Sequence, residues 1–347
     1  MTWRGIPLLL LIAFSLSAAR AEDPLVRFEA SHAAMGTVFT IIAYGGDART
    51  LAQVANEAFE EIDRLDRQMS NYQPESELSV LNRHAARRAV LVEPKLFELI
   101  ADSVRTSEET GGAFDITVGP LMKAWGLFRG QGRVPSPSEL ATVLQRVGYR
   151  HIKLDRDQRT VAFDREGIEI DLGGIAKGYA VDVAAEILRA DGVERALISS
   201  GTSSVYALGA PPDEPGWRIT LRDPFEAAKA ADVVYLKNYS LAVSGNYERF
   251  FTLNGKTYAH IMDPRIGRPV EQMLATAVLA PRATESDALS TACFVMGAQA
   301  SQRYLARHPN LLAILYQPAA APHRFQRVVL RSPDFNPPAT SLVELAH

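Results

Sequence analysis

The sequence predicts an α+β fold, in which helices pack against mixed or antiparallel sheets. Apolar residues recur at helical spacing in the first half of the chain, and short runs of β-forming residues follow from about Ile152. Helical patterns interrupt these runs twice, after Gly178 and after Ser286. A chain of 347 residues with 47% hydrophobic and 22% charged residues has the composition of a globular protein with a sizeable core.

The N-terminal segment 1–21 is predicted to be a cleavable signal peptide. Arg4 precedes an apolar run from Ile6 to Leu16, and Ala19-Arg20-Ala21 provides a small-x-small cleavage site. The run is roughly 11 residues long, shorter than the ~20 that a membrane-spanning helix needs. The single cysteine, Cys293, lies far downstream, so no lipid can be attached here. We therefore expect a periplasmic, exported protein that is not a lipoprotein and reaches membranes only through partners.

Three helices are expected before residue 150. Asp47 can cap the first, whose apolar positions share one face. A second runs from about Pro94 and ends at Gly111-Gly112, because glycine commonly follows a helix C-terminus. A third begins near Ser138. The apolar positions of the first helix are Leu51, Val54, Ala55, Ala58, Phe59, Ile62 and Leu65.

Five strands are expected after residue 150, separated by Gly, Pro and Asn turns. They are Ile168–Asp171, Ala196–Ser199, Trp217–Leu221, Leu241–Ser244 and Ala275–Leu279. We expect residues 22–331 to form one domain. The remaining segment, 332–347, carries paired prolines and is expected to be a loose tail.

Charge and cysteine content exclude several classes of function. The chain has 37 Lys and Arg against 40 Asp and Glu, a net charge of −3, which does not favour a nucleic-acid partner. One cysteine cannot form an internal disulfide framework or a cysteine-based zinc site. The seven histidines show no HExxH spacing, and Ser199–Ser204 does not match GxSxG, so zinc-protease and serine-hydrolase chemistry are disfavoured.

A glycine-rich turn at Asp171–Asp182 could bind an anion. Paired glycines lead from a β-like run into a helix, and Lys177 adds a positive charge. Glycines let the backbone approach a phosphate, and a helix N-terminus presents unpaired N–H groups. The spacing is not that of a P-loop. Alternatively, this is an ordinary strand-to-helix turn with a solvated lysine.

Asp287 and Thr291 lie at positions i and i+4 of a predicted helix, so both side chains share one face. Their oxygens are hard ligands. Two such ligands, completed by water or phosphate oxygens, are typical of Mg²⁺ sites. Alternatively, Asp287 only caps the helix and Thr291 packs.

His260 and Asp263 precede a proline-containing turn, where side chains are commonly displayed at the end of a strand. The segment from Tyr258 to Pro269 could therefore present His260 to a substrate. A single histidine can equally be structural.

Taken together, seven blocks resemble the ApbE family, the FAD:protein FMN transferases, over about Met35 to Gly297. This resemblance implies the family's T-fold-like architecture. The blocks occur in family order, which makes the resemblance specific. They are Met35-Gly-Thr37; Ser70-Asn-Tyr72 with Ser76-Glu-Leu78 and Asn82; Gly112 to Leu121 with Trp125-Gly126; Asp171 to Asp182; Ser244-Gly-Asn-Tyr247; His260 to Pro269; and Asp287 to Thr291.

The resemblance implies a reaction and a set of site residues. Such enzymes use Mg²⁺ to split FAD and attach its FMN half to a Thr or Ser of a target protein, releasing AMP. The target would be an acceptor redox protein with an FMN-binding domain. The Gly174 carbonyl, Asp287 and Thr291 would hold the metal, and His260 would assist proton transfer beside the phosphates. The residues implied around FAD are Met35, Tyr72, Ala113, Phe114, Asp115, Asp171, Lys177 and Met262.

Two departures from the family pattern keep alternatives open. Gly201-Thr202-Ser203 stands where many members have Gly-Gly-Asp, and Ser290 stands where some have a second metal-binding acid. An FAD pyrophosphatase that gives FMN to water would use the same site. A non-catalytic exported FAD-binding protein is the third possibility. The sequence identifies neither the acceptor nor the oligomeric state.

Overall fold

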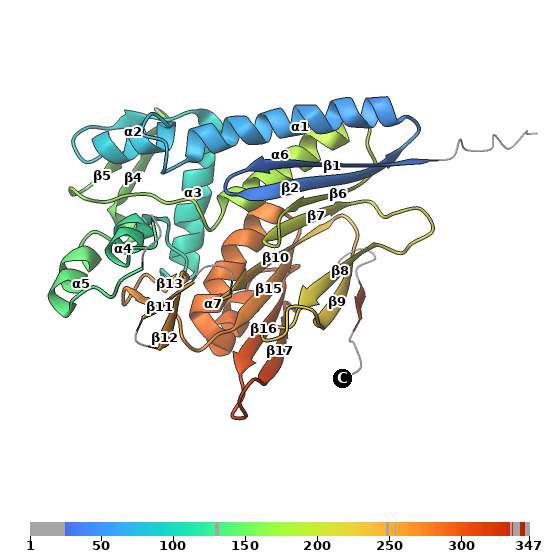
Figure 1. Ribbon diagram of the computed structural model, residues 1–347. Coiled ribbons are helices and arrows are strands. Elements are labelled where there is room, and N and C mark those ends of the chain that lie inside the picture. Colours follow the sequence, from blue (N-terminus) through green and yellow to red (C-terminus); the bar gives the residue numbers. More distant parts are fainter. Residues whose placement is uncertain are drawn as a thin grey trace, which may run out of the picture.

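The structure is a computed structural model that describes residues 25–128, 132–247, 250–253, 255–333, 335 and 341–343. The predicted signal peptide, 1–21, lies outside these residues. Among the helices that are described, none is both long and apolar enough to cross a membrane. The elements surround one large antiparallel sheet (Figure 1).

The main sheet has eight strands in the order β1-β2-β6-β7-β10-β15-β16-β17. Every neighbouring pair in it is antiparallel, as the fold class predicts. Its strands are β1 (Val26–Ala34), β2 (Thr37–Gly45), β6 (Arg195–Ser200), β7 (Ser204–Leu208), β10 (Tyr239–Gly245), β15 (Ala275–Ala280), β16 (Leu312–Pro318) and β17 (Phe325–Arg331).

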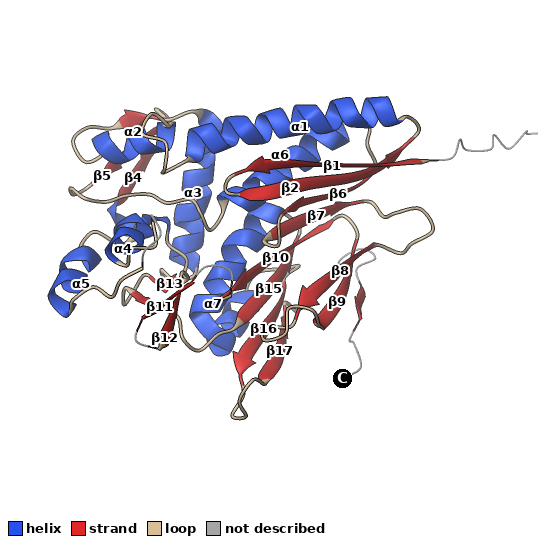
Figure 2. Cartoon of the chain, in the orientation of Figure 1, coloured by secondary structure: helices blue, strands red, loops and turns tan. Residues whose placement is uncertain are grey.

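Three long helices cover one face of this sheet: α1 (Ala48–Met69), α6 (Ala176–Ala190) and α7 (Ala283–Leu305). The other face packs against a three-stranded sheet of β8 (Trp217–Arg222), β9 (Ala230–Leu236) and β18 (Ser341–Val343). Each interface encloses its own apolar cluster. The sheet is therefore the middle of three layers (Figure 2).

A smaller group of elements lies at one end of the main sheet, on the left of Figure 1. These elements matter for function because they contain much of the resemblance blocks that begin at Ser70, Gly112 and His260. They are α2 (Glu77–His84), β3 (Val90–Leu91), α3 (Pro94–Glu109), η1 (Ile116–Val118), α4 (Gly119–Ala124), α5 (Pro137–Leu144), η2 (Tyr149–His151), β4 (Ile152–Asp155), β5 (Thr160–Phe163), β11 (Phe250–Leu253), β12 (Lys256–Ala259), β13 (Met262–Asp263) and β14 (Arg268–Pro269).

The three predicted helices are confirmed as α1, α3 and α5. Asp47 caps α1 by accepting hydrogen bonds from Arg49 N (3.2 Å) and Thr50 N (2.9 Å). Gly111 and Gly112 follow α3 with φ of 62° and 77°, values that glycine adopts without strain. Four of the predicted strands lie in β6, β8, β10 and β15.

The predicted strand Ile168–Asp171 is wrong, because its backbone groups bond outside any sheet. Ile170 N donates to Asn82 Oδ1 (2.8 Å), Asn82 Nδ2 donates to Ile170 O (2.9 Å), and Asp171 N donates to Ile116 O (2.7 Å). The segment is held by an asparagine side chain and a short helix instead of a neighbouring strand. These contacts fix the approach to the glycine-rich turn.

One further expectation needs correction. Strands do not begin only near residue 152, since the β1–β2 hairpin precedes every described helix and forms an edge of the main sheet. Within the segment 332–347, the structure describes two contacts with the rest of the chain, and its looseness stays a prediction. Ser332 Oγ and Leu311 exchange hydrogen bonds (2.9 and 3.0 Å), and β18 pairs with β9.

Candidate active site

The N-termini of α6 and α7 cap one another. Gly178 N, in the first turn of α6, donates to Asp287 Oδ2 on α7 (2.8 Å). In return, Ala283 N and Thr284 N at the start of α7 donate to Asp182 on α6 (2.7 and 2.9 Å). Burial raises the pKa of Asp182, although its hydrogen bonds to Thr284 and Ala283 act in the opposite direction. The two exchanged carboxylates fix the starts of both helices relative to one another.

This arrangement corrects the interpretation of Asp287 as a cap of its own helix. Because α7 begins at Ala283, Asp287 lies inside it and caps α6 instead. Likewise, α6 begins at Ala176, before the expected start after Gly178. A Cβ at Gly178 would lie 2.1 Å from Ala283 O and 2.6 Å from Asp287 Cβ. Gly178 therefore permits the close approach of the two helices.

The structure brings the three predicted metal ligands to this junction. A Cβ built on Gly174 would lie 3.6 Å from Thr291 Oγ1, and Thr291 is one helical turn from Asp287. Asp287 is 3% exposed, yet within the described part of the chain its Oδ1 forms no hydrogen bond or ion pair. A buried carboxylate normally requires a compensating positive charge. The donor set, a carbonyl, a carboxylate and a hydroxyl, fits a hard cation such as Mg²⁺.

This candidate metal site contains few charges. In the segments that the structure describes, no group of three or more His, Cys, Asp and Glu side chains could hold a metal ion. Asp287 would supply one negative charge, and Mg²⁺ in such sites usually keeps water or binds substrate phosphates as well. The arrangement therefore favours a cation that binds together with a phosphorylated ligand.

Lys177 and Asp171 shape the glycine-rich turn beside these residues. Asp171 Oδ1 accepts from Gly173 N (2.8 Å), and Lys177 Nζ donates to Gly173 O (3.2 Å). The ammonium group is therefore close to the turn and remains partly exposed. It places one positive charge on this side of the junction, where it could bind a phosphate oxygen.

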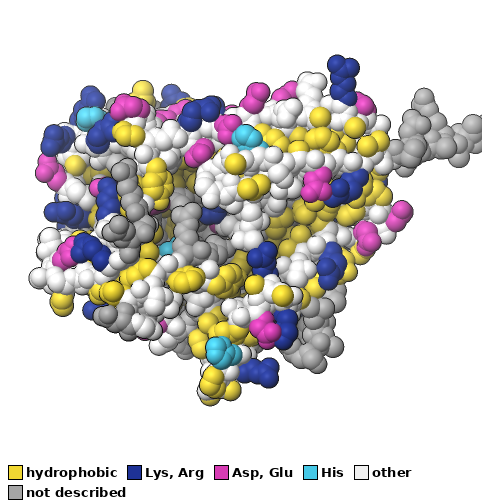
Figure 3. Space-filling view, in the orientation of Figure 1, with side chains coloured by type: hydrophobic (Ala, Val, Ile, Leu, Met, Phe, Trp, Pro, Cys, Tyr) yellow, Lys and Arg dark blue, Asp and Glu magenta, His cyan; other side chains and the backbone are white. Residues whose placement is uncertain are grey.

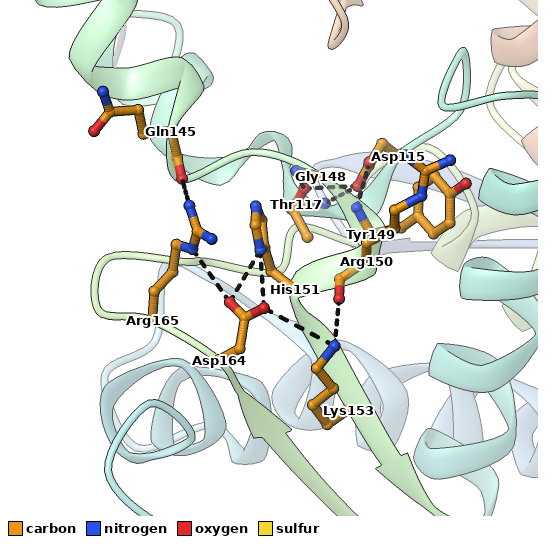
Figure 4. Close-up of polar contacts among 10 residues, drawn as sticks. All are labelled: Asp115, Thr117, Gln145, Gly148, Tyr149, Arg150, His151, Lys153, Asp164 and Arg165. Atoms are coloured by element: carbon orange, nitrogen blue, oxygen red, sulfur yellow. Dashed lines mark hydrogen bonds and ion pairs between the residues drawn. The ribbon is translucent and has the colours of Figure 1, made fainter.

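The segment Ala113-Phe114-Asp115 lies on the other side of the turn. Ala113 and Phe114 are buried, and Phe114 Cε2 would lie 3.3 Å from a Cβ on Gly174. Asp115 uses both carboxylate oxygens within the protein. It accepts from Thr117 N (2.8 Å) through Oδ1 and from Tyr149 N (2.7 Å) through Oδ2 (Figure 4). Burial raises the pKa of Asp115, and these hydrogen bonds oppose the shift.

Figure 4 shows how Asp115 is supported. The η2 turn that follows α5 bonds to it, and His151 in this turn contacts Asp164 (Nδ1 to Oδ1, 2.9 Å). Asp115 therefore acts in this structure as an organiser of the loop beside Phe114. Its contact with FAD stays a prediction.

Met35 lies in the tight turn between β1 and β2. Its φ of 50° is unusual for a residue other than glycine, and Met35 N donates to Asp66 Oδ2 (3.0 Å). The next turn along the sheet contacts this hairpin, because Gly201 N donates to Val38 O (2.8 Å). The Gly201-Thr202-Ser203 segment thus lies beside the Met35 hairpin.

Tyr72 presents an exposed aromatic face. It is 52% exposed and stacks on Phe128 with ring centroids 4.6 Å apart and an interplanar angle of 6°. Lys123 Nζ lies 5.2 Å from the centroid of the Phe128 ring. Phe128 was not predicted as a site residue, although it follows the Trp125-Gly126 block closely enough to have been a candidate. This pair could receive another flat ring.

His260 lies two residues before the start of the short β13–β14 hairpin, whose Met262 is buried. Asp263 closes the hairpin turn by binding Arg265 (Oδ1 to Nε, 2.8 Å). Trp125 Nε1 donates to Gly267 O (2.9 Å), which fastens the hairpin to α4. His260 is partly exposed, so a ligand could reach it.

A groove of about 890 Å³ between α1 and α6 contains none of the predicted site residues. Its lining mixes acidic and basic side chains, and Glu61 there pairs with Arg64 (2.7 Å) and Lys95 (3.8 Å). Charges of both signs are also interspersed over the visible face of the molecule (Figure 3). We therefore assign the groove no ligand and place the chemistry at the α6–α7 junction.

Cys293 is fully buried in α7, and burial raises the pKa of its thiol to about 11. A thiol with such a pKa is not a nucleophile near neutral pH.

Comparison with known proteins gives a consistent result. A model of the ApbE family matches residues 35–315. The FAD:protein FMN transferase of Treponema pallidum is 31% identical over 335 residues, covering 91% of each chain. That of Vibrio cholerae (O395) is 32% identical over 298 residues, covering 83% of this chain and 87% of the relative.

Solved structures agree. The ApbE protein of Thermotoga maritima superposes with a TM-score of 0.78 and 32% identity, covering 89% of this chain and 98% of that one. The flavin transferase ApbE from Vibrio cholerae gives a TM-score of 0.77 and 26% identity, covering 90% of this chain and 99% of that one.

Proposed function

The chain belongs to the ApbE family, and from this premise we propose that it is an FAD:protein FMN transferase. The substrate would be FAD and the cofactor Mg²⁺. The FMN moiety would pass to a Thr or Ser hydroxyl of a target protein, and AMP would be released. The observation that carries the proposal is Asp287, a buried carboxylate that caps α6 with one oxygen and whose other oxygen has no hydrogen bond or ion pair with the residues that the structure describes.

The junction of α6 and α7 suits the phosphates of FAD. The Gly174 carbonyl, Asp287 and Thr291 would hold Mg²⁺. The bound cation would neutralise charge on the pyrophosphate of FAD. The Lys177 ammonium group would bind phosphate oxygens on the neighbouring side. Transfer of a phosphoryl group depends mainly on positioning and charge neutralisation, and these residues supply both.

The transfer step needs one proton acceptor. The acceptor hydroxyl oxygen forms a bond to the phosphorus of the FMN half, and the bond from that phosphorus to the AMP oxygen breaks. The hydroxyl proton passes to a base, for which His260 is the candidate. An imidazole with an ordinary pKa of ~6.5 can accept a proton near neutral pH.

The remaining predicted residues would bind the rest of FAD. Tyr72, stacked on Phe128, offers a flat face to a ring system. Met35, Met262 and the segment from Ala113 to Asp115 would complete the flavin side, together with Asp171 at the glycine-rich turn. The strained backbone of Met35 is typical of a position under functional constraint.

One experiment separates transferase from the two alternatives. Mature protein is incubated with FAD, Mg²⁺ and a candidate acceptor domain, and both AMP and the acceptor mass are followed. A transferase releases AMP and adds FMN to the acceptor. AMP with free FMN indicates an FAD pyrophosphatase, and the absence of both products indicates a non-catalytic FAD-binding protein, for which the missing acid at Gly201-Thr202-Ser203 is the supporting feature.

The acceptor would be a redox protein with an FMN-binding domain in the same compartment. We propose export to the periplasm and predict that the mature chain begins at Glu22, because Ala19-Arg20-Ala21 directly follows the apolar run. N-terminal sequencing of the secreted protein measures this. A chain that starts at Met1, or a product retained in the membrane, contradicts the periplasmic assignment.

Lys177→Ala is expected to weaken FAD binding by roughly ten- to a hundredfold, because a hydrogen bond to a charged group contributes about 1.5–3 kcal/mol. The lysine is partly exposed, and among the described residues its ammonium group bonds to Gly173 O alone (3.2 Å), so folding should change little. Flavin fluorescence titration measures the affinity. Lys229→Ala, which removes an exposed lysine that pairs with Glu226 in the turn between β8 and β9, is the control. Equal affinities of both variants would place Lys177 in solvent.

A further inference from the structure

Three hydroxyl groups connect β10 with α7 beside the candidate metal site. Ser244 Oγ on β10 lies 2.7 Å from Ser290 Oγ and 3.3 Å from Thr291 Oγ1, both on α7. Ser290 is fully buried, Ser244 is 9% exposed, and Thr291 is partly exposed. The exposed end of this chain of hydroxyls is therefore Thr291, the residue that faces Gly174.

Each hydroxyl has one proton, and this determines the direction of the chain. Ser290 Oγ donates to the Asp287 carbonyl oxygen (2.8 Å), so it can only accept from Ser244. Ser244 uses its proton in that bond and can only accept from Thr291. The order Thr291 to Ser244 to Ser290 to the Asp287 carbonyl gives every proton an acceptor.

The opposite order is less favourable. Suppose that Ser290 donated to Ser244 and Ser244 to Thr291. The Thr291 proton would then have no acceptor among the described hydrogen bonds, and the Asp287 carbonyl would no longer receive the hydrogen bond from Ser290. Polar groups at such partly buried positions are nearly always paired. The carbonyl at the buried end therefore sets the orientation of the hydroxyl at the exposed end.

We propose that Ser244 is a positioning residue for the metal ligand Thr291. By accepting the Thr291 proton, it turns the lone pairs of Thr291 Oγ1 away from β10 and toward the cation. A hydroxyl can bind a cation only through a lone pair, so its proton must be held elsewhere. This inference rests on the proposed Mg²⁺ site at Gly174, Asp287 and Thr291.

The same strand contains a matched control. Ser240 Oγ contacts Ser286 Oγ on α7 (3.0 Å), and both side chains are fully buried. Ser240 also donates to Ala280 O (2.7 Å), and Ser286 donates to Ala283 O (3.1 Å). This pair joins the same two elements, but none of these bonds involves Thr291. Loss of Ser240 should therefore test packing without testing metal orientation.

The experiment measures Mn²⁺ binding to the full mature protein with FAD present, by electron paramagnetic resonance titration. Ser244→Ala is expected to weaken Mn²⁺ binding by about 10- to 100-fold, the usual effect of removing a partner that orients a metal ligand. Ser240→Ala should leave the Mn²⁺ affinity unchanged. It should lower the melting temperature about as much as Ser244→Ala does. Ser290→Ala removes the acceptor of the Ser244 proton and should also weaken Mn²⁺ binding, so it decides the question if Ser244→Ala does not fold.

Asp287→Asn separates this inference from the proposed function. If Asp287→Asn binds Mn²⁺ as tightly as the unmodified protein, the metal site itself is wrong, and the role of Ser244 falls with it. If Asp287→Asn weakens binding but neither Ser244→Ala nor Ser290→Ala does, the site stands and the positioning role is overturned. Equal weakening by Ser244→Ala and Ser240→Ala would show a packing effect and also overturn it.

Discussion

Asp287→Asn is expected to reduce AMP release by on the order of a hundredfold or more, while the melting temperature barely moves. Asn retains an oxygen that can accept from Gly178 N, so the capping contact between α6 and α7 survives. The variant loses the negative charge that this helix would give the cation. Without it the metal would bind FAD phosphates poorly, and charge in the transition state would lose its stabilisation.

Melting curves and Mg²⁺-dependent turnover should be measured on the same preparation of this variant. Partial recovery at high Mg²⁺ is expected, since the site is weakened rather than destroyed. Asp47→Asn is the control, because it makes the same change at the exposed cap of α1, where Asn caps about as well as Asp. Full activity with unchanged Mg²⁺ dependence contradicts the metal assignment. Lost activity with a large fall in melting temperature would show that Asp287 is structural.

The sequence predicts those helices and strands whose signals lie within the element itself or at its ends. The apolar residues of α1 recur at helical spacing, Asp47 marks a helix start because its side chain can bond the first N–H groups, and Gly111 marks a helix end because glycine adopts positive φ. The segment Ile168–Asp171 misleads for the same reason, because β-forming residues indicate an extended chain and not its partners. Asn82, distant in sequence, takes the hydrogen bonds that a neighbouring strand would have made.

The candidate site was predictable in the same limited sense. The spacing of Asp287 and Thr291 places both on one helical face, and the resemblance adds Gly174. The contacts that fix these groups were not predictable, because each joins residues far apart in the chain. Gly178 and Asp287 are 109 positions apart, and Ser244 and Thr291 are 47 apart. Nothing local in Ser244 distinguishes a ligand's partner from an ordinary strand residue.

Gly178 was predicted to lie in the candidate site, but the role that its sequence context suggested is not the one that the structure shows. In the sequence it belongs to a turn that would approach a phosphate. In the structure it lies inside α6, where its missing side chain lets α7 come close enough for Asp287 to reach its N–H. Glycine inside a helix costs about 1 kcal/mol relative to alanine, so a compensating contact is expected.

Gly178→Ala should therefore destabilise the protein by about 2 kcal/mol or more, despite the better helix propensity of alanine. The new methyl group would lie 2.1 Å from Ala283 O and 2.6 Å from Asp287 Cβ, and a backbone carbonyl cannot move aside alone. The start of α7 would have to separate from α6, which also displaces the Asp287 carboxylate from Gly178 N. We expect a lower urea midpoint together with weaker Mn²⁺ binding.

The matched control is Gly46→Ala, where a Cβ would meet nothing within 4 Å and φ lies outside the left-handed region. Its urea midpoint and Mn²⁺ affinity should stay close to those of the unmodified protein. Both variants add one methyl group at a glycine, so any difference between them reports the contact at the helix junction. A Gly178→Ala protein as stable as Gly46→Ala would mean that α6 and α7 are farther apart than this structure has them. Lost stability with unchanged Mn²⁺ binding would detach the metal site from the junction, because the Asp287 carboxylate cannot keep its place once α7 has moved.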